Sequence, residues 1–80
     1  MMKTNDISTT NKEKLENLGI LLRELRRNFG YTQSEVAQDL NIHRNTLGRI
    51  ENSKNFTIKH LMELSEYYNI PIHEILHDVE

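Results

Sequence analysis

Start and stop signals for two short helices lie close together in the middle of the chain, and they constrain the fold more than any other feature. Thr32 and Glu35 have the spacing of a capping box, in which each side chain accepts a hydrogen bond from the other residue's backbone amide. The apolar pattern that follows predicts a helix over residues 33–40. Asn41, which tolerates left-handed backbone angles, is expected to end it. Helical spacing resumes over residues 44–52, so we predict two helices joined by a turn of about three residues.

Apolar side chains also recur at helical spacing on both sides of this pair. They predict a helix over residues 14–28, which Gly30 terminates, and two more over residues 58–68 and 72–78. Pro71 can begin the last of these, because a proline needs no amide proton at a helix start. No segment has the alternating pattern of a strand. We therefore predict an all-α fold, a compact five-helix bundle with a helix-turn-helix.

The length of the chain allows one domain. At 80 residues, folding buries only about 60% of the surface that the unfolded chain exposes. We expect the domain to span residues 14–80, after a polar arm over residues 1–13 that lacks periodicity and is predicted to be disordered. A separate catalytic domain has no room, so we expect no enzyme activity.

Two absences from the sequence restrict the compartment. The chain has no cysteine, hence no disulfide framework and no thiolate metal site, and we expect neither a cofactor nor a metal. Its start lacks the apolar stretch of a signal peptide, and its longest apolar run, residues 19–22, is far shorter than the roughly 20 residues that cross a bilayer. We expect a cytoplasmic protein without a membrane partner.

Charge is unevenly distributed along the chain. The formal net charge of -2 alone argues against a nucleic-acid partner, because neutralising phosphates requires Lys and Arg. However, residues 1–57 hold nine Lys or Arg against seven Asp or Glu, whereas residues 58–80 hold one against five. The first part of the chain can therefore present a basic face to DNA, while the acidic end is left for solvent or a partner subunit.

The predicted helix over residues 44–52 has one apolar side and one polar side. At about 100° per residue, Leu47 and Ile50 lie on the first side, and Arg44, Asn45 and Arg49 lie on the other. Arginine reads guanine through two parallel donors, and asparagine reads adenine through a donor and an acceptor. The outer side suits base edges, although a solvated helix face is the alternative interpretation of exposed charges.

Gly48 lies on the same outer side. A glycine costs about 1 kcal/mol of helix stability relative to alanine. A bare backbone would let this helix approach DNA or a neighbouring helix closely.

The motifs LRELR, TQSEVA and RIEN, which open, continue and close the segment from residue 22 to residue 52, occur here together. With them, the chain from residue 18 to about residue 76 resembles the helix-turn-helix domain of phage repressors and Cro proteins, a lambda-repressor-like DNA-binding domain. The resemblance implies sequence-specific binding of double-stranded DNA and regulation of transcription. It also implies that Arg26 pairs with Glu51 inside the domain, and that Gln33 holds a phosphate and braces the recognition helix.

The resemblance assigns the remaining site residues as well. The residues expected to contact bases are His43, Arg44, Asn45, Thr46 and Arg49. The residues expected to contact phosphates are Thr32, Gln33, Asn52, Ser53, Lys54 and Asn55. The chain departs from the family pattern at Asn41, where Gly is preferred, at His43, where Ser or Thr is preferred, and at Phe56, where many members have Pro.

The stretch ENSKNFTIKHLMEL further resembles the controller proteins of restriction-modification systems, which regulate their own operon. This resemblance implies a homodimer on a near-palindromic operator, for which we expect contact through the helices over residues 58–68 and 72–78. Such a regulator either blocks RNA polymerase or helps to recruit it. The alternatives are a phage-type repressor and an antitoxin-like protein-interaction module.

One motif points to a different chemistry. His73 and His77 match H-E-x-x-H, the spacing by which a helix presents two zinc ligands and a glutamate base. A hydrolytic zinc site also needs a third protein ligand and a substrate cleft. Because the apolar residues between the two histidines already explain a packed helix, we interpret the motif as coincidental.

Overall fold

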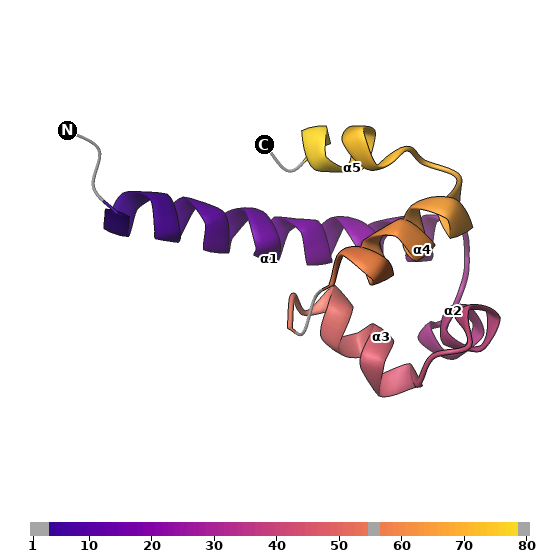
Figure 1. The fold of residues 1–80 in the computed structure, drawn as a ribbon. Helices are drawn as coiled ribbons and strands as arrows, with labels where there is room; N and C mark the ends of the chain where they lie inside the picture. The colour runs from indigo at the N-terminus through magenta and orange to yellow at the C-terminus, as the bar shows by residue number, and fades with distance from the viewer. Residues whose placement is uncertain (1–3, 55–56, 79–80) are drawn as a thin grey trace.

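The chain forms five helices within the residues that a computed structural model describes, which are 4–54 and 57–78, with side chains described for 12–54 and 57–77. No strand is found in these ranges, so the predicted all-α fold is confirmed. The helices are α1 (Thr4–Asn28), α2 (Gln33–Leu40), α3 (Arg44–Glu51), α4 (Ile58–Tyr68) and α5 (Ile72–Asp78) (Figure 1).

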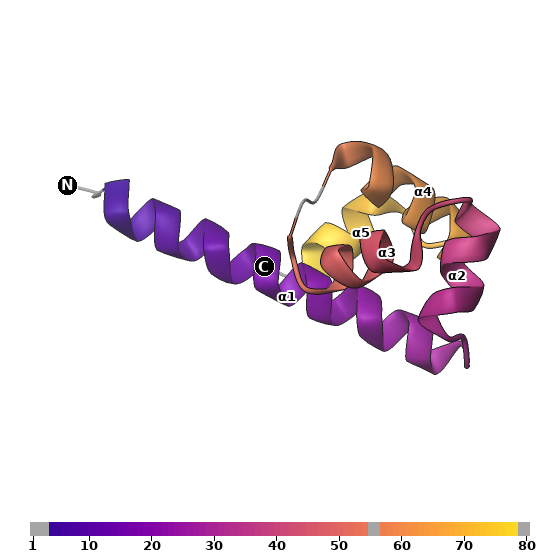
Figure 2. The ribbon, with the colours of Figure 1, turned by 90° about the horizontal axis from the view of Figure 1, so that it is seen from below.

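The first helix is the longest element and organises the others. It packs against α3 and against α5, while α2 packs on α3 and α4 on α5. In Figure 1 the two short helices α2 and α3 lie on one side of α1 and α5 lies on the other. Figures 1 and 2 both show that the N-terminal half of α1 projects beyond the body. None of the described helices combines the length and the apolar character that crossing a membrane requires.

Each helix contributes to one core. The most deeply buried side chains include Leu22 from α1, Val36 from α2, Leu47 from α3, Leu64 from α4 and Ile75 from α5. Burying side chains of this size contributes roughly 1.5–3 kcal/mol each. The core therefore ties the short α2 and α3 to the rest of the chain.

Local capping sets most of the helix ends. The capping box is formed, with the Glu35 amide donating to Thr32 Oγ1 at 3.1 Å and the Thr32 amide donating to Glu35 Oε1 at 2.8 Å. Asn41 ends α2 in the left-handed conformation, with φ at 56°, and Asn69 ends α4 in the same way. Consequently α2 and α4 have the expected bounds. The bounds of α5 are also as expected, and α3 ends one residue earlier than expected.

The start of α1 differs from the sequence-based expectation. The helix begins at Thr4, whereas we expected a helix from about residue 14 and a disordered arm before it. Residues 4–18 contain neither Gly nor Pro, and extending a helix from a packed turn costs far less free energy than starting one. Residues 1–3 of the expected arm lie outside the described residues.

Gly19 permits a close approach between α1 and the end of α3. A Cβ atom at this position would lie 2.5 Å from the carbonyl oxygen of Glu51 and 2.5 Å from Ser53 Oγ. Ser53, whose φ is 62°, also donates a hydrogen bond from its hydroxyl to the carbonyl of Leu15. Because Gly19 has no side chain, the turn after α3 can pack directly against α1.

We predict that Gly19→Ala destabilises the protein by about 1–3 kcal/mol, because the added methyl group collides with backbone rather than with a flexible side chain. Urea unfolding followed by circular dichroism measures this. The matched control is Gly48→Ala, where the new methyl group would have its nearest neighbour at 3.9 Å and the helix should gain up to about 1 kcal/mol. Equal stability of Gly19→Ala and the wild type would contradict the close approach.

Candidate nucleic-acid interface

Helix α3 has one side against the core and the other side exposed. Leu47 and Ile50 are fully buried. At the start of the helix, His43 acts as the N-cap, and its Nδ1 accepts a hydrogen bond from the amide of Asn45 at 3.2 Å. Because Nδ1 accepts, the proton of the neutral ring is on Nε2, which remains a donor on an exposed side chain.

The outer side of α3 carries the side chains that we expect to contact bases. His43, Arg44, Asn45 and Arg49 are exposed, and Thr46 is half-buried. Among the described residues, neither of these arginines forms an ion pair. Their guanidinium donors are therefore free to bind an acceptor from outside the chain.

A shallow groove of about 280 Å³ lies between this side of α3 and the start of α2. It contains two arginines and no carboxylate, so its charge is positive and suits an anionic partner. Two residues assigned to phosphates lie here beside three assigned to bases. The lining residues are Gln33, Arg44, Asn45, Gly48, Arg49 and Asn52.

Packing between the helices does not explain the glycine in this groove. A Cβ atom on Gly48 would have Gln33 Nε2 as its nearest neighbour, at an ordinary contact distance of 3.9 Å. The position is half-buried rather than enclosed. The groove wall is thus lower at Gly48 than the fold itself requires.

A buried ion pair joins α1 to the last residue of α3. Arg26 Nε donates to Glu51 Oε2 at 2.8 Å, and Arg26 Nη2 donates to Glu51 Oε1 at 3.1 Å, so the two side chains that we expected to pair are brought together. Their side chains are only 11% and 1% exposed. Arg26 Nη1 also donates to the carbonyl of Tyr31 at 2.9 Å. The hydrogen bonds that Arg26 donates to Glu51 raise the pKa of Arg26 despite its burial, which keeps the guanidinium charged.

Two further side chains hold the same end of α3. Gln33 Nε2 donates to Glu51 Oε1 at 3.1 Å, so the first residue of α2 is bonded to the last residue of α3. Arg23 Nη2 lies 3.4 Å from the carbonyl of Glu51 and 3.4 Å from Asn52 Oδ1. A positive charge next to the last carbonyls of a helix also interacts favourably with the helix dipole.

The residues assigned to phosphate contacts differ in whether their hydrogen-bond donors are already used within the chain. Lys54 and Thr32 are exposed, and Asn52 is exposed with its side-chain oxygen near Arg23, which leaves its amide group as a donor. Ser53 donates its hydroxyl proton to the carbonyl of Leu15. A phosphate could therefore accept from this hydroxyl only by displacing that hydrogen bond. Asn55 lies outside the described residues.

Arg23 and Gly19 were not identified from the sequence as part of this arrangement. They and Arg26 follow one another at helical spacing of four and three residues, so all three share the face of α1 that meets α3. The resemblance pairs Arg26 with Glu51, the last residue of α3. The spacing of Gly19 and Arg23 from Arg26 is therefore the signal that could have placed them on the same face.

The histidines of the H-E-x-x-H motif lie exposed on α5. Among the described residues, no group of three His, Cys, Asp or Glu side chains lies close enough together to hold a metal ion. The structure therefore offers these two histidines no third protein ligand within its described part.

A family model described as helix-turn-helix matches residues 22–75, which is more than half of the chain. The match begins within α1 and ends within α5, and so includes the groove and the ion pair. No curated protein and no solved structure matches the chain.

We predict that Glu51→Gln destabilises the protein by about 3 kcal/mol or more, because it leaves the Arg26 guanidinium buried without a counter-charge. Chemical unfolding at neutral pH measures the loss. Glu24→Gln, an exposed change of the same kind on α1, is the control and should alter stability by less than about 0.5 kcal/mol. Indistinguishable losses for the two variants would show that the ion pair does not hold α3.

Proposed function

The chain belongs to the helix-turn-helix family of DNA-binding transcription regulators, and from this premise we propose that it binds a near-palindromic operator as a homodimer. In this proposal each copy sets α3 into the major groove of one half-site. The two half-sites lie about 34 Å apart, one helical turn of DNA. The protein acts by occupying DNA and performs no chemistry.

The observation that carries the proposal is the outer side of α3, where arginine and asparagine side chains are exposed beside a groove without a carboxylate. Arg44 and Arg49 supply paired donors for guanine, and Asn45 supplies a donor and an acceptor for adenine. His43 adds a single donor through Nε2, which suits an acceptor such as the O6 or N7 atom of guanine. The low wall at Gly48 lets the duplex come close to the helix backbone.

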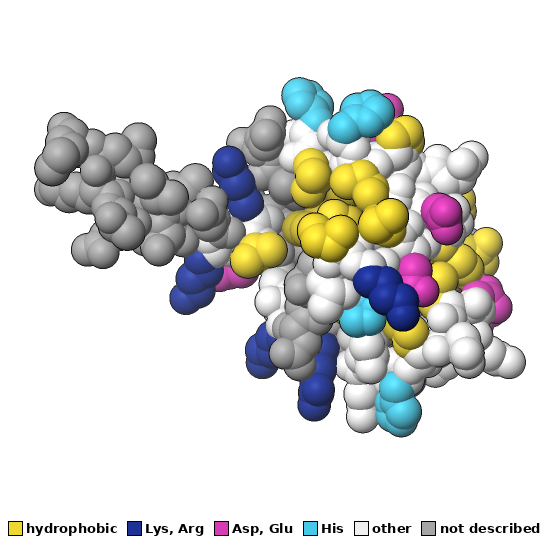
Figure 3. Space-filling view, in the orientation of Figure 1, with side chains coloured by type: hydrophobic (Ala, Val, Ile, Leu, Met, Phe, Trp, Pro, Cys, Tyr) yellow, Lys and Arg dark blue, Asp and Glu magenta, His cyan; other side chains and the backbone are white. Residues whose placement is uncertain are grey.

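The proposed dimer uses an apolar surface on α4 and α5. Ile58 and Met62 on α4 are 70% and 53% exposed, and Leu76 on α5 is exposed as well. Figure 3 shows apolar side chains gathered over α4 and α5, and none of Ile58, Met62 and Leu76 lines the groove beside α3. A second copy covering this surface would leave both recognition helices free, as a two-fold symmetric operator requires.

We further propose that the protein is the controller of a restriction-modification system. This proposal rests on the resemblance of residues 51–64 to controller proteins, which regulate the operon that encodes them. The DNA sequence that the protein selects should then occur upstream of its own coding region, next to genes for a restriction enzyme and a methyltransferase. RNA polymerase is the partner that such occupancy would block or recruit.

Selection from a random double-stranded DNA library tests the function, with Arg44→Ala and Lys54→Ala compared with the wild type. The wild type should enrich an inverted repeat. Arg44→Ala should cost about 1–3 kcal/mol and lose the preference at one position of each half-site, because its contact is to a base. Lys54→Ala should enrich the same repeat, bind all sequences more weakly and depend less on salt, because its contact is to the backbone. Failure of the wild type to enrich any sequence would refute the function.

A charge on the apolar surface tests the dimer. We predict that Met62→Glu shifts the protein from dimer to monomer in sedimentation without DNA, because two carboxylates would be buried against each other. Gln38→Glu, which adds the same charge on an exposed position of α2, should sediment like the wild type. A wild-type monomer, or a Met62→Glu dimer, would refute this interface.

A further inference from the structure

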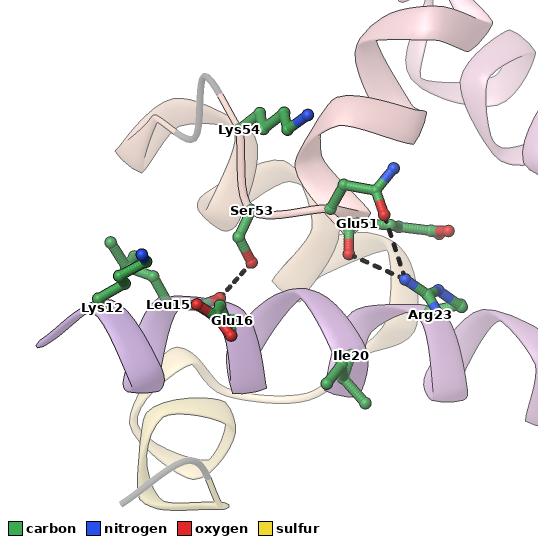
Figure 4. A pocket seen from close by; sticks show the side chains of 9 residues that line it. Lys12, Leu15, Glu16, Ile20, Arg23, Glu51, Ser53 and Lys54 are labelled. Carbon is green, nitrogen blue, oxygen red and sulfur yellow. Dashed lines mark hydrogen bonds between the residues drawn. The ribbon is translucent and has the colours of Figure 1, made fainter. Parts of the chain in front are cut away.

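A second groove, of about 480 Å³, lies between α1 and the segment that follows α3 (Figure 4). Lys12 and Arg23 on α1 and Lys54 on that segment line it. Its carboxylates are Glu51, which is paired with Arg26, and Glu16, which is exposed. Three cations from two separate elements therefore face one space that contains a single unpaired acid among its lining residues.

We propose that this groove receives the sugar-phosphate backbone of the bound DNA, with Lys12 on α1 as a phosphate contact. The proposal rests on the proposed function and extends the DNA interface from α3 onto α1. Of the three cations in the groove, the sequence had assigned only Lys54 to DNA.

The position of the groove favours DNA as its occupant. Helix α3 has eight residues and is therefore about 12 Å long, comparable with the width of the major groove in which it would lie. Side chains just past its end thus meet one phosphate strand. The groove opens at this place, beside Asn52 and Lys54, and α1 continues past the body from here (Figures 1 and 2).

The donors in the groove are suited to phosphate oxygens. Lys12 and Lys54 are exposed, and each ammonium has three donors. Arg23 makes only long contacts, at 3.4 Å, through one of its nitrogens, so its other donors are uncommitted. Leu15 and Ile20, about half exposed on the groove wall, offer apolar surface to lysine stems and deoxyribose carbons.

The test measures DNA affinity of the full-length protein by fluorescence anisotropy, on the duplex selected by the wild type, over a series of salt concentrations. For Lys12→Ala we expect weaker binding and a log–log salt slope shallower by about 1.8, which is one phosphate contact in each subunit of the dimer. Lys14→Ala is the matched control, because Lys14 is also exposed on α1 but does not line the groove, and its slope should equal that of the wild type.

Two further measurements make the result specific. Glu16→Gln should bind more tightly than the wild type, because it removes a negative charge beside the phosphates. Ethylation of single phosphates should reveal one position in each half-site where ethylation weakens the wild type but not Lys12→Ala.

The failures of the two proposals are distinguishable. If the wild type selects a DNA sequence but Lys12→Ala keeps its affinity and salt slope, the groove contact is refuted and the proposed function stands. If Lys12→Ala and Lys14→Ala lose the same DNA affinity, the loss reflects the net charge of the protein rather than a specific contact. The groove contact is then also refuted. If the wild type selects no DNA, both proposals fail.

Discussion

The buried ion pair between Arg26 and Glu51 is the interaction on which the rest of the molecule depends. Glu51 is the last residue of α3, and its carboxylate accepts hydrogen bonds from α1 through Arg26 and from α2 through Gln33. Burying a charged pair gains little stability over a well-packed apolar pair, but its bonds have direction. The pair therefore fixes the orientation of α3 relative to α1 and α2. This orientation in turn determines which side chains of α3 face solvent.

The surface of the protein has regions of different chemical character. The outer side of α3 and the groove beside α1 meet at Asn52, so a duplex that contacts one can reach the other. The exposed apolar side chains of α4 and α5 do not line the groove beside α3. Short helices around a single core thus leave one region for DNA and, in the proposed dimer, another for a second copy.

Much of the fold could be predicted because its signals are local. The capping box at Thr32 and the left-handed Asn41 act within a few residues, and they set the bounds of α2 as expected. The start of α1 was not predicted, because it depends on how far a helix extends beyond its packed part. The roles of Gly19 and Arg23 were not predicted either, because the helical spacing that they share with Arg26 indicates a common face but not their contacts with residues about thirty positions away. For the site, residue types indicated the outer face, whereas only the structure shows which donors are already used.

The measurement that tests the central claim most directly is amide NMR of the full chain as the selected duplex is added. If the ion pair turns the outer side of α3 toward DNA, the largest shift changes will fall on residues 43–49 and on the start of α2, with the amides of α4 and α5 changing least. Largest changes on α4 and α5, with residues 43–49 unaffected, would contradict the account.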